Sequence, residues 1–306
     1  MAITYKHSGN AGDIIYALAG IKQIHLKYGK KADIRLWLDR PGFYYQGATH
    51  PLGDVIFNQY MMDRLRPLLM AQPYVESVEP YRGEKIIVDL DLIRQRKVNM
   101  PYGSIARWYF YVFPDMAADL SLPWLQVPAM VQDDDIILVN RTERYRNPFI
   151  SYEFLRYYPS VYFVGTPGEY QLLAKQIPSM KYLEFKNFYD LAVAIRSCKL
   201  FIGNQSMCFA IAEAMKTPRI LEVCDFAPNV VPSGGGPGFD FYSQAAFEYY
   251  VTELAGKRMD KPAVVPSPDP IRAAMLALVS QDVMKRVGEL TLVDYPRLLK
   301  LAEYVR

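Results

Sequence analysis

The chain has 306 residues, 51% of them hydrophobic, which is enough for packed cores and for two domains of ordinary size. Its 35 Lys and Arg residues against 32 Asp and Glu residues give a net charge of only +3, so composition offers no strong case for a protein that binds nucleic acid or an anionic membrane. No apolar run approaches the length of about 18 residues that a membrane span requires. The N-terminal segment also lacks the apolar core of a signal peptide, and we therefore expect a cytoplasmic protein.

The cysteines and histidines limit which metal sites, disulfides and catalytic mechanisms we expect. Cys198, Cys208 and Cys224 lie in apolar surroundings without the CxxC spacing of a zinc site, so we expect buried free thiols in a reducing compartment. The three histidines, His7, His25 and His50, all lie in the first sixth of the chain. A mechanism that uses a histidine of the second half is therefore excluded.

The first part of the chain alternates short apolar runs with longer helical patterns, which predicts βαβ units and a largely parallel sheet. The runs that predict strands are 3–7, 32–38, 75–81 and 85–91, and the helical patterns are 14–28 and roughly 58–72. Two prolines, mixed apolar residues and an acidic triplet then predict an interdomain linker over 120–133.

The same alternation returns in the second part. Strands are predicted at 135–140, 161–166, 181–185, 199–204 and 219–223, and helices near 151–158, at about 168–177, at 188–198 and at 207–215. A glycine-rich loop at 231–241, helical stretches, a proline-rich joint at 261–270 and C-terminal helices follow. The pattern predicts an α/β fold with two Rossmann-like, doubly wound domains, 1–125 and 126–306, that face each other across a cleft. The last helices are candidates to pack back on the N-terminal domain.

The segment HSGNAGD, residues 7–13, follows the first strand and opens a helix. Its glycines allow backbone N–H groups to turn toward an anion or a polar ligand, and the start of a helix adds partial positive charge. Two interpretations of Asp13 remain open. It is a good residue for a helix N-cap, and a carboxylate at the carboxyl end of a strand is equally suited to be a general base.

The segment RTERYRN, residues 141–147, places Arg141, Arg144 and Arg146 in a loop after a strand. A guanidinium group can donate two parallel hydrogen bonds to phosphate oxygens, so the loop is suited to hold a diphosphate and to stabilise it as a leaving group. The alternative is a solvated basic loop.

Residues 201–223, FIGNQSMCFAIAEAMKTPRILEV, predict a strand that ends at Gly203 and Asn204 and a helix that opens near Gln205 or Ser206. The free N–H groups of the first helical turn suit a phosphate. Glu213 lies within the otherwise apolar helix. Its carboxylate either accepts hydrogen bonds from ribose hydroxyls or is a charge on the helix surface.

Two further patterns have competing interpretations. The carboxylates Asp89 and Asp91, and those of 133–135, match the D-x-D pattern of metal-dependent nucleotide-sugar enzymes, but so short a pattern is frequent by chance and we predict no metal site. The aromatic segment 107–114 suits either core packing, which we favour, or stacking on a sugar ring or base.

Five blocks of the chain resemble, in order, those of the ADP-heptose lipopolysaccharide heptosyltransferase family of GT-B glycosyltransferases. The blocks are YKHSGNAGDIIYALAGIKQI, QPYVESV, VDLDLIR, YFVGTPGEYQLLAKQ and DLAVAIRSCKLFIGNQSMCFAIAEAMKTPRI, within residues 1 to about 225. The resemblance implies an acceptor-binding N-terminal domain, a C-terminal domain that binds a nucleotide sugar, and an inverting transfer without a metal or other cofactor. The implied enzyme is a hexosyl- or heptosyl-type transferase.

The resemblance also implies roles for individual residues. Asp13 matches the family's catalytic base, and the basic loop residue that neutralises the donor phosphates falls among Arg144 and Arg146. The ribose-binding glutamate of GT-B enzymes matches Glu213, and an acidic residue of the next-to-last block matches Glu169. The residues expected to bind the donor are Arg141, Arg144, Arg146, Gly165, Glu169, Asn204, Gln205, Ser206, Met207 and Glu213. The residues expected to bind the acceptor are His7, Ser8, Gly9, Asn10 and Gly12.

The chain departs from the family where the family reads G-N-D-S-G-x-x-H. Here Gln205, Met207 and Ala210 stand in place of the donor-side Asp, Gly and His, which predicts a relative with a changed donor or acceptor. One alternative is a nucleotide- or carbohydrate-binding protein that has lost transfer. Another, motivated by the basic stretch IRQRK at 93–97, is a glycosyltransferase that acts on modified DNA.

Overall fold

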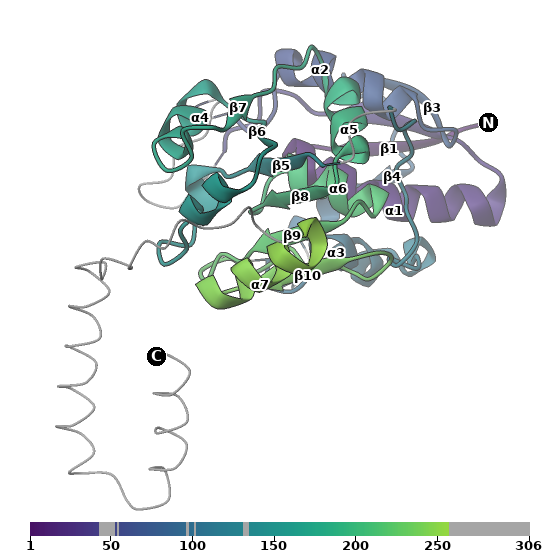
Figure 1. The fold of residues 1–306 in the computed structure, drawn as a ribbon. Coiled ribbons are helices and arrows are strands. Elements are labelled where there is room, and N and C mark those ends of the chain that lie inside the picture. The colour runs from purple at the N-terminus through teal and green to yellow at the C-terminus, as the bar shows by residue number, and fades with distance from the viewer. Residues whose placement is uncertain (43–52, 54, 96–97, 101, 131–134, 257–306) are drawn as a thin grey trace, which may run out of the picture. The chain divides into compact units, whose positions relative to one another are not determined.

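The first sheet has four parallel strands in the order β3-β2-β1-β4. Figure 1 labels β1, β3 and β4. The computed structural model describes residues 1–42, 53, 55–95, 98–100, 102–130 and 135–256, and these residues all belong to one compact unit. The strands of this sheet are β1 Ile3–His7, β2 Ala32–Leu36, β3 Val75–Pro80 and β4 Val88–Asp89. The helices of this part are α1 Ala11–Tyr28, α2 Gln59–Met70 and α3 Ile105–Val112, with 3₁₀ turns η1 Leu90–Arg94 and η2 Pro114–Met116. Three of the predicted strands are confirmed, whereas only Val88–Asp89 of the predicted run 85–91 form a strand and the turn η1 begins at Leu90.

Helix α1 begins earlier than the sequence pattern predicts. Its N-cap is Asn10, and Asp13 is the third helical residue, whose carboxylate accepts the Asn10 N–H. The prediction of Asp13 as the cap residue is therefore wrong by three positions. An acidic residue at this third position satisfies an orphan N–H of the helix start just as a capping residue does, so the same side-chain chemistry fits either register.

The second sheet has six parallel strands in the order β10-β9-β8-β5-β6-β7. Its strands are β5 Ile137–Asn140, β6 Val161–Phe163, β7 Lys181–Tyr182, β8 Leu200–Gly203, β9 Arg219–Glu222 and β10 Gly238–Phe241. Its helices are α4 Pro167–Ala174, α5 Phe188–Ser197, α6 Met207–Met215 and α7 Gln244–Ala255, with 3₁₀ turns η3 Glu143–Tyr145 and η4 Glu153–Tyr157. The two sheets with their helices confirm the predicted α/β fold.

Two local predictions need correction. The helix expected near 151–158 is the short 3₁₀ turn η4. The end of the expected glycine-rich loop is the edge strand β10, because the chain from Gly238 pairs in parallel with β9 once the glycines of 234–236 have turned it. The proline-rich joint at 261–270 and the predicted C-terminal helices lie outside the described residues.

Trp124, in the predicted linker, joins helices of both parts of the chain. Its backbone N–H donates to the carbonyl oxygen of Ala214 in α6 (2.9 Å), and its indole N–H donates to the carbonyl oxygen of Ile15 in α1 (2.9 Å). A single hydrophobic core includes buried side chains of α1, α3, α5 and α6. Residues 117–130 form neither helix nor strand, as expected of the linker, and the domain boundary near 125 stays a prediction.

The three cysteines are buried and free, as predicted. Burial raises the pKa of the thiols of Cys198 and Cys208 to about 12, so at neutral pH both remain protonated and unreactive. Among the described helices, none has the length and apolar character needed to cross a membrane.

Candidate functional site

Each sheet has a point at which the strand order reverses. In the first sheet this point lies between β1 and β4, and in the second it lies between β5 and β8. Ligands of open α/β sheets bind outside the carboxyl ends of the strands at such points. The loop before α1 and the turn η1 follow the first pair of strands, and the segments from Arg141 and from Asn204 follow the second pair.

Asp13 lies at the first reversal point and is held from one side. Its Oδ2 atom accepts hydrogen bonds from the backbone N–H of Asn10 (3.3 Å) and from Nη2 of Arg94 (3.0 Å). The Asp13 side chain is 18% exposed. A Cβ atom at Gly9 would lie 2.5 Å from Arg94 Nη2 and 2.7 Å from Asp13 Oδ2, so the ion pair requires a residue without a side chain at this position.

His7 fixes the loop before α1 from within the core. Its Nδ1 accepts the N–H of Gly9 (2.8 Å), so in the neutral ring Nε2 carries the proton and donates to the hydroxyl of Tyr109 (2.7 Å). The Tyr109 hydroxyl then donates to the carbonyl oxygen of Asp13 (3.1 Å). Burial and the neighbouring Arg94 cation lower the pKa of His7 to about 3, which keeps the ring uncharged.

This buried histidine predicts a loss of stability in mild acid. The pKa of His7 is about 3 in the folded protein and 6.5 in its ordinary state, so between these values the unfolded chain binds more protons and stability falls as the pH falls. The expected slope is about 1.4 kcal/mol per pH unit well below pH 6.5. Urea denaturation of the wild type and of His7→Gln from pH 7 to about pH 5 measures it. The free energy of unfolding of His7→Gln should lack the pH dependence that His7 contributes. Equal slopes in the two proteins would show that His7 is not the group that causes the loss of stability.

The other residues that we expected to bind the acceptor mainly stabilise the loop before α1. Ser8 is buried, and its backbone N–H donates to Oδ1 of Asp91 (2.9 Å). With the Gly9 N–H bound to His7, these two loop N–H groups bind protein atoms in place of the ligand that we expected. Asn10 and Gly12 are partly exposed.

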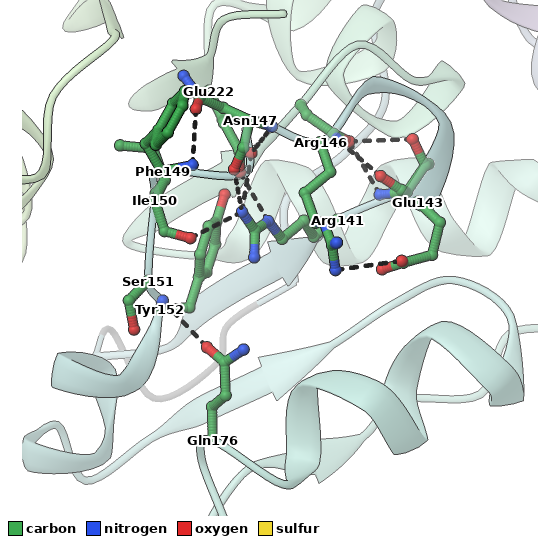
Figure 2. Close-up of polar contacts among 12 residues, drawn as sticks. Arg141, Glu143, Arg146, Asn147, Phe149, Ile150, Ser151, Tyr152, Gln176 and Glu222 are labelled. Carbon is green, nitrogen blue, oxygen red and sulfur yellow. Dashed lines mark hydrogen bonds and ion pairs between the residues drawn. The ribbon is translucent and has the colours of Figure 1, made fainter. Parts of the chain in front are cut away.

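Arg141 is a buried structural residue (Figure 2). Its Nε and Nη2 atoms bind the two carboxylate oxygens of Glu222 at 2.8 and 2.9 Å, and Nη2 also donates to the carbonyl oxygens of Asn147 (3.0 Å) and Ile150 (2.9 Å). Its guanidinium carbon lies 4.5 Å from the ring centre of Tyr152. We expected Arg141 to hold the donor, but its Nε and Nη2 atoms instead hold the loop 141–150 in place.

The other two arginines of the loop are nearer the solvent. Arg146 is 45% exposed and pairs with Glu143 at 3.2 Å (Figure 2). Arg144 is half-buried, with its guanidinium carbon 5.4 Å from the ring centre of Tyr145. Within the segment RTERYRN, Arg144 and Arg146 are thus the arginines that can reach a ligand.

The start of α6 lies at the second reversal point. The side chain of Asn204 accepts the backbone N–H of Thr142 (2.9 Å) and donates to its carbonyl oxygen (2.7 Å), which ties the loop after β5 to the loop after β8. Ser206 is the N-cap of α6, where its hydroxyl accepts the N–H of Phe209 (3.2 Å). Met207 is the first helical residue.

The side chain of Gln205 binds protein atoms through its amide nitrogen, while its amide oxygen is buried without a hydrogen-bond partner among the described residues. The amide nitrogen of Gln205 donates to the carbonyl oxygen of Ala227 and to the side chain of Asn229, each at 2.6 Å.

Glu213 is 1% exposed and pairs with Lys216 (2.5 Å) and with Arg219, and it accepts the N–H of Ser233 (3.0 Å). We expected this carboxylate to meet ribose hydroxyls or solvent. In the structure, however, the two cations and the backbone N–H satisfy the buried charge.

Gly165 and Glu169 build the turn between β6 and α4. Thr166 is the N-cap of α4, and the Glu169 carboxylate accepts its backbone N–H (3.0 Å) and its hydroxyl (2.9 Å). Gly165 has a φ of +150°, and a Cβ atom there would lie 2.8 Å from the ring of Phe163. Both residues therefore have a local structural role at this edge of the sheet.

The first turns of α1 and α6 lie against each other. A Cβ atom at Gly12 would be 3.6 Å from the Cα atom of Met207 and 3.7 Å from its backbone nitrogen. Asp13, next to Gly12, is thus carried by a helix whose start touches the start of α6. The two reversal points therefore lie side by side, and the residues around both make up the candidate site.

The acidic pairs have protein partners. Asp89 and Asp91 lie 2.6 and 3.7 Å from Nζ of Lys6, and Asp135 lies 2.8 Å from Lys199, while 133–134 lie outside the described residues. In the part of the chain that the structure describes, no group of three or more His, Cys, Asp or Glu residues could hold a metal ion.

The aromatic segment is mainly a core element. Trp108 and Tyr109 are buried, as the core-packing interpretation predicts, whereas Tyr111 is 69% exposed.

The sequence pattern did not identify three residues that organise the site, namely Arg94, Tyr109 and Thr142. Arg94 was visible only as part of the block VDLDLIR and of a basic stretch, and Tyr109 only as one aromatic residue among several. The D-x-D-x-x-R spacing of Asp89, Asp91 and Arg94 is the one signal that points to this side of the site, since a 3₁₀ turn brings residues three apart together.

Comparison with known proteins shows the fold alone. No family model matches the chain, and no curated protein matches its sequence. Among solved structures, E. coli heptosyltransferase WaaC with ADP has a TM-score of 0.55 at 10% identity, covering 83% of this chain and 100% of that one. E. coli ADP-heptose lps heptosyltransferase II has a TM-score of 0.52 at 14% identity, covering 92% and 99%. The glycosyl transferase family 9 structure from Veillonella parvula DSM 2008 has a TM-score of 0.50 at 12% identity, covering 91% and 97%. The fold matches that of GT-B heptosyltransferases, and the predicted resemblance is confirmed at this level.

Proposed function

We propose that the protein is an inverting, metal-independent glycosyltransferase that moves a sugar from a nucleotide-diphosphate sugar to an acceptor hydroxyl. The glycosyltransferase-like fold supports sugar transfer in general. The observation that carries the finer proposal is the contact between the first turns of α1 and α6, because α1, which carries the partly exposed carboxylate of Asp13, then begins beside the N-terminus of α6. The acceptor would bind to the first sheet and the donor to the second.

In the proposed reaction Asp13 removes the proton of the acceptor hydroxyl as its oxygen attacks the anomeric carbon. The bond between this carbon and the donor's diphosphate oxygen breaks, and the negative charge moves onto the leaving diphosphate. The N-terminus of α6 and the guanidinium groups of Arg144 and Arg146 would stabilise that charge. Attack from the face opposite the leaving group inverts the anomeric configuration.

Two of the similar structures are of E. coli heptosyltransferase WaaC, one with ADP and one with ADP-2-deoxy-2-fluoro heptose, which supports a nucleotide sugar as the donor here. The buried ion pairs of Glu213 do not favour its role as a ribose ligand. We therefore propose that residues other than Glu213 recognise the nucleotide of the donor. The proposed acceptor is a glycan or another compound with a hydroxyl group.

A donor screen tests this proposal. The protein is incubated separately with ADP-heptose, ADP-glucose, UDP-glucose and GDP-mannose, each with and without EDTA. Release of the nucleoside diphosphate is measured in each sample. We expect slow release from at least one donor, since water can replace the acceptor, and no loss of rate on chelation. If no donor releases its nucleoside diphosphate, the proposed transfer is wrong, whether or not a donor raises the Tm.

The amide nitrogen of Gln205 and the carboxylate of Glu213 bind protein atoms. This favours a second candidate, a nucleotide- or carbohydrate-binding protein that transfers no sugar. Such a protein would be stabilised by a nucleotide sugar, by about 2.7 kcal/mol at 100 times the Kd, yet would release no nucleoside diphosphate. The same screen thus separates the two functions.

A further inference from the structure

Five charged side chains form a row of alternating sign along the carboxyl edge of the first sheet, in the order Asp89, Lys6, Asp91, Arg94, Asp13. Lys6 Nζ lies 2.6 Å from Asp89 Oδ2 and 3.7 Å from Asp91 Oδ2. The guanidinium of Arg94 reaches Asp91 Oδ1 at 3.3 Å with Nη1 and Asp13 Oδ2 at 3.0 Å with Nη2. The row therefore ends on the carboxylate of the proposed base.

The inner end of the row is anchored to the backbone. Asp91 is 7% exposed, and its Oδ1 atom also accepts the N–H of Ser8 (2.9 Å). Its own N–H donates to Oδ1 of Asp89 (3.1 Å). These contacts fix Asp91, so the fork of Arg94 has a rigid support on one side and Asp13 on the other.

Only one oxygen of Asp13 is used by these contacts. Among the described residues, the donors to its carboxylate are the Asn10 N–H and Arg94 Nη2, and both bind Oδ2. The 18% exposure of the side chain leaves Oδ1 as the oxygen for a ligand. A carboxylate held in this manner cannot rotate freely about its terminal bond.

We propose that Arg94 is the positioning residue of the base: it holds Oδ2 of Asp13 and so directs Oδ1 toward the acceptor hydroxyl. Asp91 supports Arg94 and acts on Asp13 only through it. This inference rests on the proposed transfer reaction. Arg94 itself touches neither donor nor leaving group in this scheme.

The test is steady-state release of nucleoside diphosphate from the four donors of the screen by wild type, Arg94→Met and Arg94→Lys. Arg94→Met should lower kcat by about 10²-fold, as expected for a misplaced catalytic group, while the KM for the donor stays unchanged. Arg94→Lys should recover part of kcat, because an ammonium group can bind Asp13 but cannot bridge both carboxylates. Arg35→Met is the matched control, since Arg35 is 21% exposed and paired with Glu84 away from Asp13, and it should keep wild-type kcat.

A double-mutant cycle tests whether Asp91 acts on Asp13 only through Arg94. Asp91→Asn should lower kcat less than Arg94→Met does, and the double variant should be no slower than Arg94→Met alone, because Asp91 acts through Arg94. Fully additive losses would overturn that dependence. If Arg94→Met does not fold, Arg94→Gln replaces it with the same expected loss.

The outcomes separate this inference from the proposed function. If Asp13→Asn loses turnover but Arg94→Met keeps wild-type kcat, the positioning role is wrong and the proposed function stands. If Asp13→Asn keeps wild-type turnover, the proposed role of the base fails and the role of Arg94 fails with it.

Discussion

Asp13→Asn is expected to lose about 10²- to 10⁴-fold of turnover, the usual contribution of a positioned general base. An asparagine side chain keeps the size of aspartate and an oxygen that can accept the Asn10 N–H and the Arg94 guanidinium, but it cannot take the proton of the acceptor. The fold and the KM for the donor should therefore remain as in the wild type. Release of nucleoside diphosphate in the presence and absence of acceptor measures the effect.

The matched control for this variant is Asp33→Asn. Asp33 is a half-buried aspartate of β2 whose carboxylate accepts a hydrogen bond from Ser77 (2.7 Å), so the same loss of charge occurs in the same sheet without touching the site. We expect wild-type turnover from Asp33→Asn. Equal turnover in the two variants would remove Asp13 from the mechanism.

Arg141→Met is expected to destabilise the protein by about 3–5 kcal/mol, the cost of breaking a buried ion pair on one side. The substitution leaves the carboxylate of Glu222, which is 0% exposed, with the backbone N–H of Asn147 (2.5 Å) but without its cation. It also removes the donors that hold the carbonyl groups of Asn147 and Ile150. Urea denaturation monitored by circular dichroism measures the change in the free energy of unfolding.

Arg146→Met, in the same loop, is the control for stability. Arg146 and its partner Glu143 are 45% and 43% exposed, and such a surface pair contributes at most about 1 kcal/mol. Its substitution should instead weaken donor binding. A loss of stability in Arg141→Met no larger than in Arg146→Met would show that Arg141 is not the structural residue we describe.

The alternation of strands and helices could be predicted from the sequence because it depends on local periodicity. The strand runs of both sheets follow from short apolar segments, and α6 follows from its apolar pattern between Ser206 and Met215. The error at the start of α1 arose because Asn10 and Asp13 both have side chains suited to a helix start. The edge strand β10 escaped prediction because the glycines before it dominate the local signal.

The partners within the site could not be predicted, because they depend on tertiary contacts. Arg94 meets Asp13 across 81 residues of sequence, and Arg141 meets Glu222 across the same separation. The sequence shows that Arg141 follows a strand, but it does not show that the carboxylate of Glu222 on β9, which lies beyond β8 in the sheet, binds its guanidinium. For Glu213 a local signal existed, since Lys216 lies one helical turn further on.

The central claim is that a sugar is transferred with inversion and that Asp13 removes the proton of the attacking hydroxyl. The most direct measurement is a time-resolved proton NMR spectrum of the anomeric signal of the first product formed from the donor that the screen identifies. We expect a first product whose anomeric configuration is opposite to that of the donor, formed by the wild type and almost absent with Asp13→Asn. A first product of unchanged configuration would contradict it.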